Sequence, residues 1–280
     1  MKIETFSIVV GGTACNAHCP FCVSKMTPKN DLDTKAPPIN WQVFNTALRL
    51  TERCNVTTCL LSSKGEPLIY QKLLLEYVKR IDASGMPFIE LQTNGILLNP
   101  SNLLDLRLAG LTTICISCVS YKIEQNQAIY SPQYKELAVV IDMIHKAKMS
   151  VRLSIVVIKN HIDTYDSFKA MIEFAKTHKV EQMTFTPVSI PKKSINKEVA
   201  EWAWNNKTDF CENVKLWLTR LEAITLMVLP HGAVIYDVGG QNICVSNCLK
   251  PPGENDTLRN LIFDGNHIRY DWQFKGAILL

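Results

Sequence analysis

The sequence predicts an α/β protein in which six β/α units form a parallel sheet shaped as a partial barrel, followed by a short carboxy-terminal capping extension. Apolar, β-branched runs recur at intervals of roughly 30 residues, the usual length of a βαβ unit. Amphipathic stretches separate these runs, as parallel strands require. The runs are nearly continuously apolar, which is typical of a sheet covered on both faces. Six units fall short of the eight that close a full barrel, so we expect an open, curved sheet.

The elements follow one another in a regular order. The first strand is predicted at residues 5–10 and ends at two glycines; the others are predicted at residues 56–62, 88–93, 112–119, 151–158 and 180–186. Helical spacing of apolar residues predicts helices at residues 41–53, 68–83, 99–109, 133–148 and 163–178. Right-handed crossovers bring all the strand-to-helix loops to one rim of such a sheet, so we expect ligands to bind there.

The chain after Pro187 has a weaker pattern. Residues 197–224 carry apolar and aromatic side chains at helical spacing, and residues 225–229 are a candidate seventh strand. Beyond Pro230 the chain is rich in Gly, Asn, Asp and Pro, and short strands are predicted at residues 233–236 and 267–270. We therefore predict two parts, a partial barrel over residues 1–229 and an extension over residues 230–280 that covers the barrel mouth.

The composition is that of an ordinary globular protein, with 47% hydrophobic and 20% charged residues. A net charge of +4 is too mild to indicate a nucleic-acid partner. No apolar run approaches the length of a membrane span, and the first residues lack the pattern of a secretory signal. Ten cysteines in such a chain favour metal ligands and reduced thiols over disulfides, so we expect a cytoplasmic protein.

Three of these cysteines, Cys15, Cys19 and Cys22, lie directly after the first predicted strand. Their spacing would place them on one face of a helix, but Pro20 disfavours a regular helix there. A loop that wraps a metal is the better interpretation. If His18 is a fourth ligand, the pattern is typical of a zinc site. Alternatively, three thiolates on a four-iron cluster leave one iron open for a substrate or cofactor.

The CxxxCxxC spacing, with Phe21 before the third cysteine, resembles the signature of the radical S-adenosylmethionine (radical SAM) superfamily. This resemblance implies a [4Fe–4S] cluster on Cys15, Cys19 and Cys22, with S-adenosylmethionine chelating the open iron. It implies reductive cleavage of S-adenosylmethionine to a 5′-deoxyadenosyl radical that abstracts hydrogen from a small-molecule or peptide substrate. An external one-electron donor, such as flavodoxin or ferredoxin, would supply the electron.

The resemblance extends to the two following loops. The stretch from Lys64 to Pro67 resembles the Gly-Gly-Glu-Pro element that holds the methionine amino group, which implies this role for Gly65 and Glu66. Lys64 stands where that element usually has its first glycine. Asn94, in the Thr-Asn-Gly sequence that ends the third strand, is implied as a further cofactor contact. Asn-Gly is also an ordinary turn signal, so both interpretations of Asn94 stay open.

In the family the remaining cofactor contacts come from the ends of later strands. Side chains alternate between the two faces of a strand, so Ser117 lies on the face of strand four opposite the apolar residues of that strand. Arg152 and Ser154 share one face of strand five. These three are implied as ribose and carboxylate contacts, although Arg152 is alternatively an exposed residue at the start of its strand. Thr186 on strand six and Phe21 are placed to meet the adenine.

Two other functions stay open on the sequence alone. One is an activating enzyme that installs a glycyl radical on a partner protein, and the other is a non-enzymatic zinc-binding module. Cys244 and Cys248 lie four residues apart in the tail and would need Cys211 or another ligand to hold a second cluster. The other cysteines are expected to be small buried apolar residues, namely Cys54, Cys59, Cys115, Cys118 and Cys211.

Overall fold

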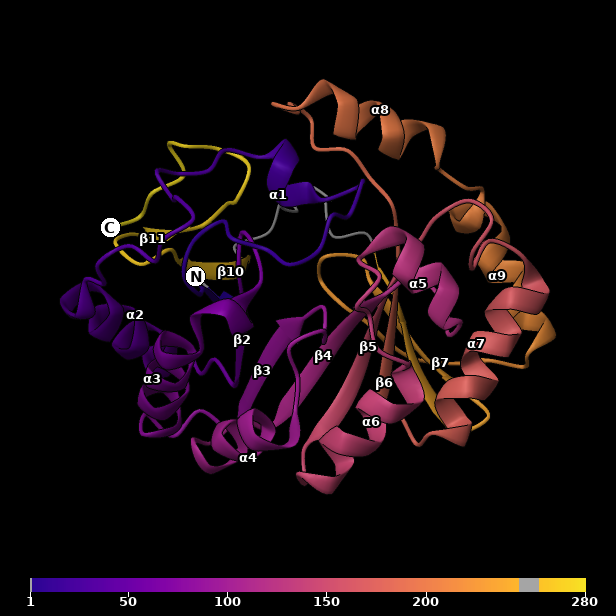
Figure 1. Ribbon diagram of the computed structural model, residues 1–280, viewed down its shortest axis with the longest axis horizontal. Helices are drawn as coiled ribbons and strands as arrows, with labels where there is room; N and C mark the ends of the chain where they lie inside the picture. The colour runs from indigo at the N-terminus through magenta and orange to yellow at the C-terminus, as the bar shows by residue number, and fades with distance from the viewer. Residues whose placement is uncertain (1, 247–256) are drawn as a thin grey trace.

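The six predicted β/α units form the centre of the molecule. The computed structural model describes residues 2–246 and 257–280. Its central strands pair in parallel and lie in chain order, as β1 (Lys2–Val9), β2 (Thr58–Ser62), β3 (Phe88–Thr93), β4 (Thr113–Cys118), β5 (Ser150–Val157) and β6 (Gln182–Pro187). The sheet is curved and does not close on itself (Figure 1). The predicted α/β class and the partial barrel of six units are confirmed.

Helices cover the convex side of this sheet (Figure 1). They are α2 (Trp41–Arg53), α3 (Gln71–Asp82), α4 (Pro100–Leu108), α6 (Leu137–Lys146) and α7 (Tyr165–Thr177). The predicted helix at residues 68–83 is divided, because a 3₁₀ turn, η1 (Pro67–Tyr70), precedes α3. Two short helices that the sequence pattern did not predict, α1 (Val23–Met26) and α5 (Ile123–Ile129), follow β1 and β4. None of the helices in the described part of the chain is long and apolar enough to cross a bilayer.

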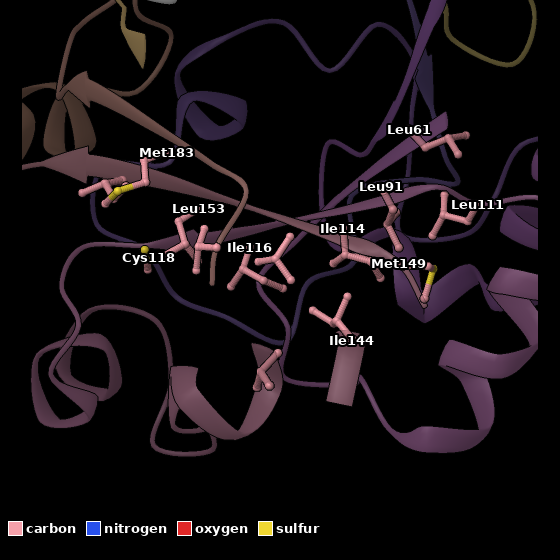
Figure 2. Packing of buried hydrophobic residues seen from close by; sticks show 14 of the residues in the cluster. Leu61, Leu91, Leu111, Ile114, Ile116, Cys118, Ile144, Met149, Leu153 and Met183 are labelled. Carbon is pink, nitrogen blue, oxygen red and sulfur yellow. The ribbon is translucent and has the colours of Figure 1, made fainter. Parts of the chain in front are cut away.

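The two faces of the sheet differ in chemistry. Leu61, Leu91, Ile114 and Leu153 point toward the helices and pack with Ile144 of α6 in one buried cluster (Figure 2). Along β5 and β6 every second residue is buried in this way, and the residues between them are half-buried on the opposite face. The apolar face therefore supplies the core, and the other face is left for polar groups.

A row of small polar side chains crosses that inner face. Ser117, Ser154, Thr184 and Cys244 are register partners on four adjacent strands. The sequence alternation predicted that Ser117 turns away from the apolar face, and the register agrees. Parallel strands in register place these side chains side by side, so the inner face offers a continuous polar surface at this level.

Nearer the start of the strands, Arg152 forms an ion pair with Glu90 of β3. Its Nε donates to Glu90 Oε2 at 2.8 Å, its Nη2 donates to Glu90 Oε1, and its Nη1 donates to Thr184 Oγ1 at 3.0 Å. The side chains are 18% and 12% exposed, so both charges are largely removed from water. The bidentate geometry and the third hydrogen bond offset the cost of that desolvation.

The carboxy-terminal part of the chain adds strands at both edges of the sheet. After α8 (Lys197–Asn205) and α9 (Phe210–Arg220), the strands β7 (Ile224–Val228), β8 (Val234–Val238) and β9 (Gln241–Val245) form an antiparallel ribbon in which β9 pairs in parallel with β6. At the other edge β10 (Thr257–Phe263) pairs in parallel with β1, and β11 (Ile268–Arg269) follows it. The candidate seventh strand is thus an edge strand of the ribbon. The division at residue 229, and the covering of the mouth by residues 230–280, stay predictions.

Removal of Glu90 tests the ion pair on the inner face. Glu90→Ala should lower the free energy of unfolding by about 3–5 kcal/mol, because it leaves the Arg152 guanidinium buried without its counter-charge. Urea titration measures this loss. The exposed pair of Asp142 and Lys146 is the control, and Asp142→Ala should cost less than about 1 kcal/mol. Equal effects of the two substitutions would contradict a net role for the buried pair.

Candidate metal and cofactor site

The three motif cysteines lie on an irregular loop at the carboxyl end of β1. Residues 15–22 form no helix; α1 begins only at Val23, with Cys22 as its N-cap. Two backbone hydrogen bonds shape the turn, from Cys22 N to Cys19 O at 3.4 Å and from Lys25 N to Cys22 O at 3.0 Å. The prediction of a loop in place of a helix is therefore confirmed, and the loop occupies the first position on the rim.

The loop after β2 packs directly against the cysteine loop. Glu66 N donates to Ala14 O at 2.9 Å, and Ser63 Oγ donates to Gly12 O at 3.0 Å. A Cβ atom at Gly65 would lie 1.9 Å from Ala14 O, so the close approach of the two backbones requires glycine at this position. Gly65 and Glu66 are thus brought against the residue that precedes Cys15.

The carboxylate of Glu66 ties this loop to the next one. It is 2% exposed and accepts hydrogen bonds from Thr93 Oγ1 at 2.6 Å, Asn94 N at 2.9 Å and Leu68 N at 3.1 Å. Burial raises the pKa of Glu66, and these three hydrogen bonds act in the opposite direction. An ionised carboxylate has about four acceptor positions, so roughly one remains for a further donor.

Asn94 connects the third loop to the cysteine loop. Its Nδ2 donates to Asn16 Oδ1 at 2.8 Å, and its own Oδ1 accepts from Ile96 N at 3.0 Å. On the other side, His18 N donates to Tyr130 O at 2.8 Å, which attaches the loop to the end of α5. The cysteine loop is therefore held by hydrogen bonds from three neighbouring segments of the rim.

Lys64, which departs from the family pattern, is buried beside this loop. Its Nζ donates to Thr27 Oγ1 at 2.8 Å and lies 5.5 Å from the ring centroid of Trp272. Burial lowers the pKa of Lys64 to about 8, while Cys22 raises it and Arg269 lowers it further. The side chain thus adds a buried amine near Cys22, and the backbone of the loop still follows the expected course.

The residues of the cysteine loop fit an iron–sulfur cluster. All three cysteines are free thiols. Burial, then the neighbouring Cys22 and Cys15 sulfurs, raises the pKa of Cys19 to about 12. A metal that binds a thiol displaces its proton. Asn16 Nδ2 at the loop is buried with no hydrogen-bond partner among the described residues. No group of three His, Cys, Asp or Glu side chains within residues 2–246 and 257–280 is placed to hold a single metal ion. A cuboidal cluster takes one thiolate per iron, so its ligands need not converge on one atom.

The other predicted cofactor residues are distributed over the inner face. Ser117 and Ser154 are neighbours in the polar row, and Thr186 lies on the same face near the end of β6. Arg152 precedes the end of β5 by five residues, which is roughly 16 Å at 3.3 Å per residue. Its guanidinium is engaged by Glu90 and Thr184, as described above. The cofactor roles of these residues, and of Phe21, stay predictions.

The tail cysteines are only partly described. Cys244 lies on β9 as the register partner of Thr184, and burial raises its pKa. Cys248 falls outside the described residues. A second cluster on this pair therefore stays a hypothesis.

Sequence reasoning missed the aromatic residues that surround Phe21. Its ring centroid lies 6.2 Å from that of Tyr130 in an edge-to-face arrangement and 5.9 Å from that of Trp202 on α8. Tyr130 and Tyr134 stand four residues apart in a largely polar stretch after strand four. That spacing was the available signal for aromatic side chains turned toward the rim.

Substitution of Gly65 tests the close contact between the first two loops. Gly65→Ala should lower the free energy of unfolding by about 1–3 kcal/mol, because the new Cβ overlaps Ala14 O and one loop has to move. Gly276→Ala is the matched control, since a Cβ there meets no atom within 4 Å. Thermal or urea unfolding measures both, and an equal stability of the two variants would contradict the contact.

Comparisons with known proteins identify the family of this chain. The sequence matches the family described as the Radical SAM superfamily over residues 9–175, which is more than half of the chain. A search of curated proteins gave no significant match.

Several solved structures share the fold. SuiB of Streptococcus suis bound to S-adenosylmethionine has a TM-score of 0.66 at 14% identity, and the match covers 96% of this chain and 60% of SuiB. A structure of anSMEcpe with bound AdoMet and a peptide has a TM-score of 0.50 at 15% identity, over 68% of this chain and 52% of that one. Methylornithine synthase (PylB) has a TM-score of 0.53 at 12% identity, over 91% and 74% of the two chains.

At these identities the solved structures show a common fold alone. The chain spans about 60% of the length of the SuiB chain that it matches. The family match covers β1 to α7, and so includes the cysteine loop, the Glu66 loop and the Asn94 loop. The chain belongs to the radical SAM superfamily.

Proposed function

We propose that this chain is a radical SAM enzyme in which Cys15, Cys19 and Cys22 hold a [4Fe–4S] cluster. The superfamily uses this cluster together with S-adenosylmethionine. When bound, the cluster supplies the electron that splits S-adenosylmethionine into methionine and a 5′-deoxyadenosyl radical, which abstracts hydrogen from the substrate. The observation that carries the proposal is the set of three free thiols on one rim loop, attached to the loops of Glu66 and Asn94.

The chain's own residues would bind and orient the cofactor. Glu66 is proposed to accept a hydrogen bond from the methionine ammonium through its remaining acceptor position, since a charge-assisted bond suits a buried carboxylate. Gly65 and Asn94 are proposed to contact the same end of the cofactor through their backbone and amide groups. These roles follow from the position of both loops beside the cysteine loop.

The inner face of the sheet would bind the rest of the cofactor. Ser117 and Ser154 offer hydroxyl groups suited to a ribose, and Phe21 and the backbone near Thr186 are proposed to meet the adenine. Arg152 is proposed as a carboxylate partner from the sequence, but its existing bonds to Glu90 and Thr184 would compete with that role.

We propose a small-molecule or peptide substrate and an external one-electron donor such as flavodoxin or ferredoxin. Support for a peptide comes from fold relatives, because SuiB was solved with its precursor peptide SuiA and anSMEcpe with a peptide. A cytoplasmic location is part of the proposal, because ten cysteines in such a chain favour metal ligands and reduced thiols over disulfides. The measurements below separate the zinc alternative from this proposal, and the glycyl-radical activating enzyme stays a second candidate.

Metal content and cofactor cleavage test the cluster assignment. Anaerobically purified protein should contain about four irons per chain and no zinc, by the rule of one cysteine per iron with one iron left open. Replacement of Cys15, Cys19 and Cys22 by Ala should remove the iron and abolish 5′-deoxyadenosine formation, while circular dichroism still shows the fold. Cys54→Ala is the control and should change neither quantity. Zinc without iron, or 5′-deoxyadenosine from the triple variant, would refute the proposal, and about eight irons would indicate a second cluster.

Binding of S-adenosylmethionine tests the role of Glu66. Glu66→Gln should weaken binding by about 10-fold or more, because a neutral amide loses a charge-assisted hydrogen bond to the ammonium. Equilibrium dialysis on iron-loaded protein measures the affinity. Glu76→Gln, on the exposed face of α3, is the matched control. Unchanged affinity in an iron-loaded Glu66→Gln protein would overturn the assignment.

A further inference from the structure

One buried hydroxyl group at the rim has no hydrogen-bond partner within residues 2–246 and 257–280. Tyr130 follows the last turn of α5 as its C-cap and is 3% exposed, and its Oη contacts no donor or acceptor among the described residues. A buried hydroxyl without a partner costs free energy, so such an atom in a native site calls for a bound group that completes it.

The position of Tyr130 indicates which group that is. Its carbonyl oxygen accepts the hydrogen bond of His18 N, and its ring meets the ring of Phe21 edge to face at 87°. Both contacts lie within the segment that runs from Cys15 to Cys22. Tyr130 is therefore next to the motif cysteines, and its phenol is available as a hydrogen-bond donor at the cysteine loop.

Within the pair of tyrosines at the rim, the missing partner is confined to Tyr130 among the described residues. The ring of Tyr134 lies 5.3 Å from that of Tyr130 and is similarly buried. Its hydroxyl, however, donates to Ser117 O at 2.9 Å. The backbone thus accepts a hydrogen bond from one phenol of the pair, whereas the other phenol has no acceptor in the part of the chain that the structure describes.

We propose that the hydroxyl of Tyr130 donates a hydrogen bond to a sulfur atom of the iron–sulfur cluster held by Cys15, Cys19 and Cys22. This inference rests on the proposed function. Hydrogen bonds to cluster sulfurs stabilise the more negatively charged, reduced state and so raise the reduction potential. Tyr130 would then set how readily the cluster accepts its electron.

The reduction potential of the reconstituted enzyme tests this directly. Tyr130→Phe deletes only the hydroxyl and should lower the equilibrium constant for reduction about 10-fold, a shift of about 59 mV to more negative potential for one electron. The matched control is Tyr77→Phe. Tyr77 also carries a buried, unpartnered hydroxyl, but it lies in the outer core against Phe44 and Phe263. Potentiometric titration followed by electron paramagnetic resonance should give the parent potential for this control.

The outcomes distinguish a failure of the proposed function from a failure of the proposed hydrogen bond. A parent protein without a four-iron signal refutes the proposed function itself. A parent and a Tyr130→Phe protein that both carry the cluster at equal potential overturn the hydrogen bond alone.

A second measurement covers the case in which Tyr130→Phe does not assemble a cluster. Ring-deuterated tyrosine is incorporated into protein in which Tyr70 and Tyr134 are both replaced by Phe, because the Tyr70 hydroxyl also contacts the cysteine loop, at Ala14 N. Deuterium electron–nuclear double resonance on the reduced cluster should then detect the ring deuterons next to the Tyr130 hydroxyl close to the cluster, as a hydroxyl that donates to a sulfur requires. Their absence from a loaded cluster would overturn the inference.

Discussion

The buried carboxylate of Glu66 is the contact on which the arrangement of the rim depends. A carboxylate that is 2% exposed is tolerated only when donors surround it, and here the donors are Thr93, Asn94 and Leu68. Hydrogen bonds to a charged group contribute about 1.5–3 kcal/mol each, which explains how the site offsets this burial. The same residue's N–H holds Ala14, so one side chain and its backbone align three consecutive loops.

The rim can carry polar groups because one face of the sheet is apolar and packs against the helices, while the other face is polar. The convex face contains the apolar cluster that stabilises the strands, as Ile114 and Ile116 of β4 illustrate (Figure 2). Because the strands alternate, the other face is free to carry Ser117, Ser154 and the Glu90–Arg152 pair. Polar groups therefore gather inside a curved sheet without weakening the core, and they lie below the loops that bear the cysteines.

The alternation of strands and helices could be predicted from local patterns. The cysteine loop could be predicted too, because Pro20 disfavours a regular helix and two glycines end the preceding strand. β9 and β10 were not predicted. Each joins the sheet through a partner distant in sequence, β6 and β1, and short runs such as residues 257–263 carry little periodic signal of their own. The prediction of a single helix over residues 68–83 was wrong as far as Tyr70 for a similar reason. The Tyr70 hydroxyl accepts a hydrogen bond from Ala14 N, 56 residues away, and donates one to Thr34 O.

By itself the sequence determined the class of fold, the family signature and the three thiols that can hold a cluster, because each of these depends on spacing within a short stretch. Only the tertiary structure decided which partners the other candidates have. It joined Arg152 to Glu90, placed Lys64 against Thr27 and Trp272, and left the hydroxyl of Tyr130 without a partner among the described residues. These features depend on side chains far apart in the chain, and no local preference encodes them, since they arise only when the fold brings separate strands and loops together.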